Sequence, residues 1–138
     1  MSPAIPLGVP LMDADHAVLE AMFDRVAATP DAELAALYHA IEAEVIAHFA
    51  REEILMERAG APVIHCHQTQ HRLLLGEFAA ARPGAEVDPT ALRRTFAVLA
   101  EFVAGHVGSV DRVTAGFLIG ALDTTMVQAL RLPEVERV

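Results

Sequence analysis

The sequence predicts an all-α protein, an up-down-up-down four-helix bundle with an additional C-terminal helical segment. Apolar residues recur three and four positions apart between the turn signals, which is the spacing of one buried helix face. Val and Ile never alternate with polar residues, as a half-buried strand would require. The predicted connections are short, which favours antiparallel neighbours. We expect one domain over residues 1–138, with the bundle over about 13–113 and the appended segment over about 114–138.

Capping signals place the first two helices. Asp13 is a suitable N-cap for a helix over about 13–28. A Thr-Pro-Asp signature at 29–31 supplies a hydroxyl cap, a proline at the first helical position and an early acid. It predicts a long helix to about 59, and Gly60 is its predicted stop.

The same kind of signal places the remaining helices. Pro62 begins a third helix, which ends before the Arg-Pro-Gly turn at 82–84. The Asp-Pro-Thr signature at 88–90 opens a fourth. The apolar residues over about 117–130 predict a shorter fifth helix that ends before Pro133.

Composition excludes several classes of function. All ten cationic side chains are Arg, so a lysine Schiff base and the lysine of a phosphate-binding P-loop are excluded. Nineteen acidic residues give a formal net charge of -9, which repels nucleic acid phosphates and anionic lipid. We therefore expect no nucleic acid partner. The longest apolar run, near 117–122, is far shorter than the roughly 20 residues that span a bilayer, so we expect no membrane span.

The compartment is predicted from cysteine usage and from the first residues. The single cysteine, Cys66, cannot form an internal disulfide, which fits a reducing compartment. Residues 1–16 have neither a basic n-region nor a long apolar run, so we expect no signal or transit peptide. The predicted location is cytoplasmic.

Histidines are unusually frequent, and helical geometry predicts which of them share a face. At about 100° per residue, side chains four positions apart lie about 40° apart on a helix. His48 and Glu52 form one such pair, and His67 and His71 form another. Each pair can therefore reach one metal ion.

The other histidines divide into two groups. His39 lies about 180° from His48 and His65 about 160° from His67, so both should point away from the shared centre. His16 lies amid Leu19 and Phe23, and His106 is flanked by Phe102, Val103 and Val107, which predicts that both face the core. Each of the four helices then directs at least one histidine ring nitrogen toward the centre of the bundle.

A metal explains why so many imidazoles would converge. A single histidine on an apolar face is usually a packed core residue. Burying five unpaired imidazoles would instead cost on the order of 1 to 3 kcal/mol each. Imidazole with carboxylate suits Fe, Zn, Cu or Mn, and five nitrogens exceed the ligand number of one tetrahedral zinc. The pattern favours redox metals bound in pairs.

The spacing of these residues resembles the hemerythrin family. The pattern consists of His16, then His48-Phe-Ala-Arg-Glu52, then His67-Gln-Thr-Gln-His71, then His106-Val-Gly-Ser-Val-Asp111. The flanking stretches LGVPLMDADH and HFAREEILM are similar to bacterial members of that family. The resemblance covers about residues 7–113 and fills all seven positions of the family pattern.

The resemblance implies a non-haem di-iron centre that binds O2. His67, His71 and His106 would hold one iron, while His16 and His48 would hold the other. Glu52 and Asp111 would bridge the two irons together with an oxo or hydroxo group. The iron with two histidines would keep an open position for O2. The apolar pocket positions of the family correspond to Leu19, Phe49, Val103 and Val107.

Three positions need separate comment. His106 and Asp111 lie about 140° apart on an ideal α-helix, so the family pattern and not the helical geometry places Asp111. A local π-bulge would bring both to one face. Glu20 follows His16 by four residues, the spacing of His48 and Glu52, so it is an alternative ligand. Glu53 is expected on a solvated face or just outside the ligand set.

The preferred functional interpretation is reversible O2 binding by a carrier, store or sensor. One alternative is a di-iron enzyme, although ferritin-like oxidases use carboxylate-rich ligand sets. Others are nitric oxide or peroxide chemistry and iron-sulfur cluster repair, in distant hemerythrin-like proteins whose last motif carries Glu where this chain has Asp111. A metal that only supports the fold or signals to a partner is a further alternative.

Overall fold

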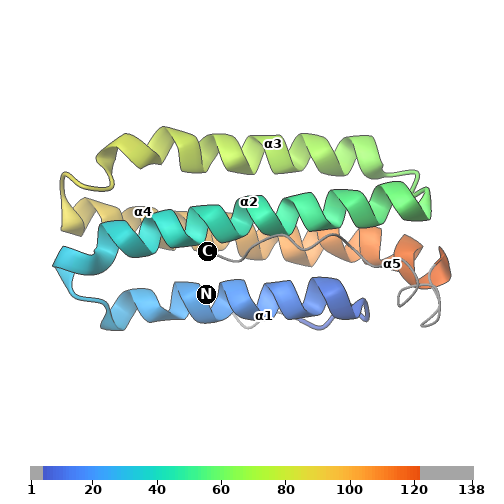
Figure 1. Ribbon diagram of the computed structural model, residues 1–138, viewed down its shortest axis with the longest axis horizontal. Coiled ribbons are helices and arrows are strands. Elements are labelled where there is room, and N and C mark those ends of the chain that lie inside the picture. Colours follow the sequence, from blue (N-terminus) through green and yellow to red (C-terminus); the bar gives the residue numbers. More distant parts are fainter. Residues whose placement is uncertain (1–4, 122–138) are drawn as a thin grey trace.

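The computed structural model describes residues 5–121 and confirms the all-α bundle. Four long helices lie side by side and alternate in direction (Figure 1). No strand occurs within residues 5–121. None of the helices in that range combines the length and apolar character needed to cross a membrane. The helices are α1 (Pro10–Asp24), α2 (Leu34–Ala59), α3 (Ile64–Ala81), α4 (Pro89–His106) and α5 (Arg112–Ala121).

Helix α1 begins earlier than the sequence predicts. Its N-cap is Val9, with Pro10 in the first turn, so Asp13 is not the cap. The Asp13 carboxylate instead accepts hydrogen bonds from the backbone N–H groups of Leu7, at 2.7 Å, and Gly8, at 3.1 Å. Asp13 therefore fixes the incoming loop against the first turn. The predicted end at about 28 is reached through a 3-10 turn, Arg25–Ala28.

The starts of α2 and α3 also differ from the predictions. The Thr29 hydroxyl donates backwards to the Arg25 carbonyl at 2.6 Å and does not cap α2. Pro30 is extended, and a 3-10 turn, Asp31–Glu33, precedes Leu34. Pro62 lies in a turn two residues before α3. The end of α2 is as predicted, because Gly60 adopts a left-handed conformation with φ 63°.

The fourth helix continues through a π segment into the fifth. Asp88 caps α4 as predicted, accepting from the backbone N–H groups of Thr90, at 2.9 Å, and Ala91, at 3.3 Å. A π segment, Val107–Asp111, then joins α4 directly to α5. Helical backbone angles at Val107 and Arg112 make the junction continuous. The predicted helix over 117–130 is therefore wrong at its start, and residues 122–130 lie outside the described range.

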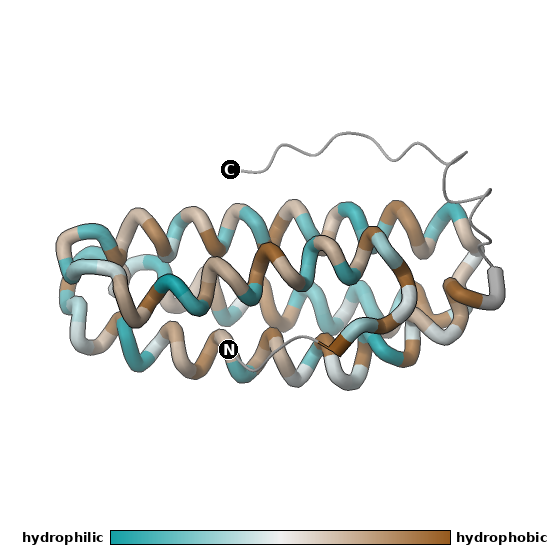
Figure 2. Tube along the Cα trace, turned by 90° about the horizontal axis from the view of Figure 1, so that it is seen from below, coloured by the Kyte–Doolittle hydropathy of each residue, from teal (hydrophilic) through white to brown (hydrophobic). Residues whose placement is uncertain are grey.

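The core consists of two apolar clusters separated along the bundle axis. Hydropathy alternates along every helix, as expected of helices with one buried face (Figure 2). The larger cluster includes Phe23, Tyr38, Phe78 and Phe96 and fills the end of the bundle where α1 meets α2. The smaller cluster, which includes Met56, fills the opposite end. Between the two clusters every bundle helix carries buried polar side chains.

The Asp88 cap gives a direct test of how α4 begins. Asp88→Ala removes the acceptor for two otherwise unpaired backbone N–H groups, so the free energy of unfolding should fall by about 1 kcal/mol. The matched control is Glu101→Ala, an exposed position on the same helix, which should change stability by less than about 0.5 kcal/mol. Urea unfolding monitored by circular dichroism measures both. Equal effects of the two substitutions would contradict the assignment of Asp88 as the cap.

Candidate metal centre

The structure brings all seven candidate ligands into the polar layer between the two apolar clusters. Each of the four bundle helices contributes, and Asp111 comes from the π segment that extends α4. All seven side chains are buried, with exposed fractions between 0% and 6%. They are His16, His48, Glu52, His67, His71, His106 and Asp111.

One group of donor atoms is built from α1, α2 and the π segment. The Nε2 atom of His16 lies 2.9 Å from Oδ2 of Asp111 and 3.6 Å from Oε2 of Glu52. The Nε2 atom of His48 lies 3.2 Å from the same Glu52 oxygen. This group therefore contains two imidazoles and one oxygen from each carboxylate.

A second group is built around the other oxygens of the same two carboxylates. The Nε2 atoms of His67 and His106 lie 2.8 and 2.9 Å from Oδ1 of Asp111. The Nε2 atom of His71 lies 3.1 Å from Oε1 of Glu52. Within each group the donor atoms all lie within 4.8 Å of one another, which is compact enough to hold one metal ion.

Several polar atoms of this layer have no hydrogen-bond partner. His16 has no hydrogen-bond partner at either ring nitrogen, and neither does Oε2 of Glu52 or either carboxylate oxygen of Asp111. The Nε2 atoms of His67 and His106 face each other at 3.2 Å. Carboxylate oxygens and imidazole nitrogens that converge without hydrogen-bond partners are suited to holding cations. The donor set therefore fits metal ions better than it fits a hydrogen-bonded core.

The π segment puts Asp111 on the same face as His106, as the sequence analysis predicts. Five residues separate them, and an ideal α-helix would turn them about 140° apart. The wider turn of Val107–Asp111 removes this offset, and Asp111 is fully buried with Oδ1 against Nε2 of His106. The Cβ positions of Gly105 and Gly108 meet open space, so packing does not require glycine at either position.

Three of the imidazoles also form a hydrogen bond through their second ring nitrogen, Nδ1. His48 contacts Asp15 at 3.1 Å, His67 contacts the Thr114 hydroxyl at 2.6 Å, and His71 contacts Glu53 at 3.0 Å. Glu53 is thus placed just outside the ligand set. Asp15 and Thr114 are not among the residues predicted from the sequence. A signal exists for Thr114, which follows Asp111 by three residues and so shares its helix face.

The residues that the sequence analysis sets apart lie apart in the structure. His39 is exposed and contacts Glu86 at 3.2 Å, and His65 is also exposed. Glu20 is half-buried and belongs to neither donor group.

The four predicted pocket residues are buried in the larger apolar cluster: Leu19, Phe49, Val103 and Val107. The Phe49 ring stacks on His71 with centroids 3.8 Å apart and lies 5.6 Å from the His48 ring. The prediction that Phe102 faces the core is wrong, because its side chain is 43% exposed. It lies at the edge of the apolar stripe of α4, beside a groove.

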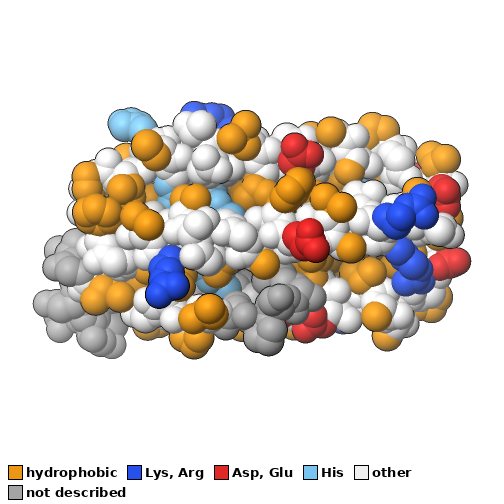
Figure 3. Space-filling view, turned by 180° about the vertical axis from the view of Figure 1, so that it is seen from behind, with side chains coloured by type: hydrophobic (Ala, Val, Ile, Leu, Met, Phe, Trp, Pro, Cys, Tyr) orange, Lys and Arg blue, Asp and Glu red, His pale blue; other side chains and the backbone are white. Residues whose placement is uncertain are grey.

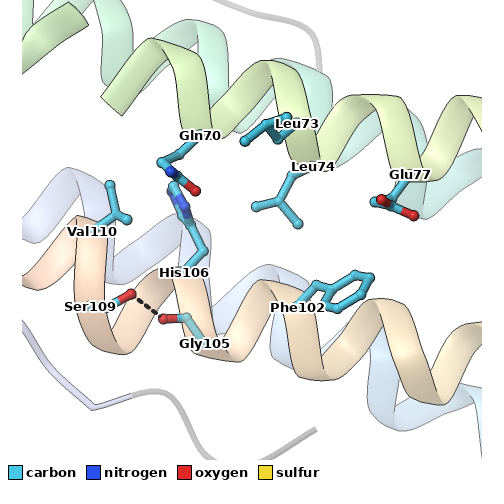
Figure 4. A pocket seen from close by; sticks show the side chains of 9 residues that line it. All are labelled: Gln70, Leu73, Leu74, Glu77, Phe102, Gly105, His106, Ser109 and Val110. Atoms are coloured by element: carbon cyan, nitrogen blue, oxygen red, sulfur yellow. Dashed lines mark hydrogen bonds between the residues drawn. The ribbon is translucent and has the colours of Figure 1, made fainter. Parts of the chain in front are cut away.

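That groove separates α3 from α4 and reaches the second donor group. Pale-blue histidine atoms are visible in a hollow on this side of the molecule (Figure 3). The groove has a volume of about 450 Å³, and Gln70 and His106 project into it from opposite walls (Figure 4). An adjoining hollow of about 470 Å³ is lined by Cys66 and His67.

Comparison with known proteins agrees with this geometry. A family model described as Hemerythrin HHE cation binding domain matches residues 7–118. The chain belongs to the hemerythrin HHE family. The match confirms the resemblance drawn from the motif. The matched range ends at residue 118, within α5, whereas the resemblance seen in the motif extends to about residue 113.

A curated relative supports the same assignment. A protein named Bacteriohemerythrin from Ralstonia nicotianae (strain ATCC BAA-1114 / GMI1000) is 34% identical over 118 residues. The alignment covers 85% of this chain and 86% of the relative. No solved structure gives a significant match.

In this hemerythrin-family chain the carboxylates set the charge of the imidazoles. Burial opposes the positive charge on His16, but Asp111 and Glu52 outweigh it and raise the pKa of His16 to about 9. Burial is likewise outweighed at His48, where Glu52 and Asp15 raise the pKa to about 10, and at His67, where Asp111 and Glu52 raise it to about 9. Without metal, these three imidazoles are protonated at pH 7.

The carboxylates respond in the opposite direction. Burial would raise the pKa of Glu52, but His48 and the other imidazoles hold it well below the usual range. Burial and the charge of Glu52 would raise the pKa of Asp111, but the close imidazoles of His106, His16 and His67 lower it. The metal-free site is therefore a network of positively charged imidazolium groups and negatively charged carboxylates.

These pKa values predict that metal uptake releases protons. Only neutral imidazole binds a metal ion, so His16, His48 and His67 must each lose a proton when the site fills at pH 7. Because their pKa values are about 9 to 10, this release should approach three protons per chain at pH 7 and should diminish toward pH 10. A pH indicator in weakly buffered solution measures it as Zn(II) is added. His39→Ala should release the same number. A release of less than one proton at pH 7 would contradict the charge assignment.

Proposed function

We propose that this chain binds two iron ions in the polar layer and uses them to bind O2 reversibly, as a carrier, store or sensor. The observation that carries the proposal is the division of the two carboxylates. Glu52 and Asp111 each turn one oxygen to the group with two imidazoles and the other to the group with three. Carboxylates shared in this way are suited to bridging two ions. Membership of the hemerythrin family supports the choice of iron and of O2.

In this proposal the two halves of the site have different roles. His67, His71 and His106 would hold one ion, and His16 and His48 would hold the other, with Glu52, Asp111 and an oxo or hydroxo group between them. An iron pair of this kind supplies reversible redox chemistry toward O2 when bound. The half with fewer protein donors leaves room for a small molecule, as catalytic metal sites do when they keep a position open.

The apolar residues around the layer would keep it dry. Leu19 lies one turn after His16, Phe49 follows His48, and Val103 and Val107 flank His106. All four are buried in the larger apolar cluster. We propose that they wall the O2 pocket by excluding water, which would otherwise bring protons to the reduced centre.

The composition of the donor set favours binding over oxidation. Five imidazoles and two carboxylates give a nitrogen-rich site, whereas ferritin-like di-iron oxidases surround their irons with carboxylates. A single cysteine, unable to form an internal disulfide, is consistent with action in the cytoplasm.

The proposal is tested by iron loading and a cycle of O2 exposure. Protein loaded with iron and reduced without air should contain two irons per chain. It should develop a charge-transfer absorbance band on exposure to O2 and lose the band under vacuum. His16→Ala, which removes a donor from the open half, should abolish the reversible band. His39→Ala and His65→Ala should leave it unchanged, because both side chains lie at the surface.

Two outcomes would contradict the proposal. One iron per chain would exclude a bridged pair. Irreversible oxidation of the wild-type protein with turnover of a product would identify an enzyme.

A further inference from the structure

The layer is linked to the surface by a charged cluster that the motif does not include. Asp15, on α1, is buried, and its Oδ2 atom lies 3.1 Å from Nδ1 of His48 on α2. The same carboxylate accepts two hydrogen bonds from Arg51, from Nε at 2.7 Å and from Nη2 at 3.1 Å. The Nη2 group of Arg51 also donates to Glu44 at 2.9 Å. We call Asp15, Arg51 and Glu44 the Asp15 cluster.

We propose that Asp15 is a positioning residue for His48. Its carboxylate can only accept, so the partner atom Nδ1 of His48 must carry the hydrogen. A neutral His48 then has its lone pair on Nε2, the nitrogen that faces Glu52 at 3.2 Å. The inference rests on the proposed function, because it gives His48 this role toward a bound metal ion.

The Asp15 cluster fixes the orientation of the Asp15 carboxylate. Arg51 donates to both carboxylate oxygens, so Asp15 cannot rotate away without breaking a two-point contact. Glu44 is also buried, and it accepts a hydrogen bond from Nη2 of Arg51. The hydrogen-bond acceptor offered to His48 is therefore rigid.

His67, His71 and His16 lack an equivalent support at Nδ1. Thr114 contacts His67 through a hydroxyl, which can donate or accept and so does not select one ring tautomer. Glu53 contacts His71, but it is 32% exposed and its carboxylate is open to water. Nδ1 of His16 has no hydrogen-bond partner. His48 is thus the anchored donor of the half that holds two imidazoles, and this half should depend on Asp15.

Zinc titration of the full chain tests the inference without O2 chemistry. The wild-type protein should bind two Zn(II) ions. Asp15→Ala should weaken the binding of one ion by about 10- to 100-fold and leave the other unchanged. Asp15→Asn should restore most of the affinity, because the amide oxygen still accepts the Nδ1 hydrogen. Glu20→Gln, on the same helix and outside both donor groups, should bind both ions as the wild type does.

A second readout reports on the ring itself. In zinc-loaded protein, ¹⁵N NMR should show a slowly exchanging Nδ1 hydrogen on His48 in the wild type and in Asp15→Asn, and a fast-exchanging one in Asp15→Ala.

Removing Asp15 takes away one hydrogen-bond partner of Arg51, so the folding of Asp15→Ala is checked by circular dichroism. If Asp15→Ala does not fold, the double variant Asp15→Leu, Arg51→Met removes both charges and keeps similar side-chain volumes. It should show the same weakened binding of one Zn(II) ion.

The outcomes separate this inference from the proposed function. If the wild type binds two ions and folded Asp15→Ala binds both with unchanged affinity, Asp15 does not position His48, while the two-metal proposal stands. An Asp15→Asn protein as weak as Asp15→Ala would also overturn the inference, because the hydrogen bond would then not be what matters. A wild type that binds fewer than two ions would overturn both.

Discussion

The structure depends on burying two carboxylates, Glu52 and Asp111, in the middle of a helical bundle. Neither can be left there alone, because an isolated buried charge is far more costly than a hydrogen-bonded one. Five imidazoles, drawn from all four bundle helices, surround them, and the resulting polar layer divides the apolar core into two clusters. Several buried atoms still lack hydrogen bonds, so protein groups alone do not complete the layer. Metal ions would complete it, which couples the assembly of the four helices to metal binding.

The helices were predictable where a local signal acts alone. Asp88 caps α4 and Gly60 ends α2, because each acts on backbone groups of its own helix end. Asp13 and Thr29 were assigned wrongly as caps because each has a competing partner. Asp13 accepts from the incoming loop, and the Thr29 hydroxyl donates to the previous turn. No propensity rule ranks such alternatives, since the choice depends on how the preceding residues pack.

The candidate site was more predictable than the helix ends. Rotation by about 100° per residue puts His48 with Glu52, and His67 with His71, on one helix face each without knowledge of the fold. Asp111 needed the family pattern, because its position depends on the π segment. Asp15 and Thr114 were missed because they meet His48 and His67 across helices, 33 and 47 residues away in the sequence. The spacing from Asp111 places Thr114 on the inward face, but single-helix geometry does not say which imidazole it or Asp15 contacts.

The central claim is that Glu52 and Asp111 each serve two ions at once. It is tested most directly by anomalous diffraction at the iron absorption edge from crystals of the iron-loaded chain. The account predicts two peaks about 3.5 to 4 Å apart. One should lie beside His16 and His48 and the other beside His67, His71 and His106, with an oxygen of Glu52 and an oxygen of Asp111 next to each. A single peak, or two peaks that share neither carboxylate, would contradict it.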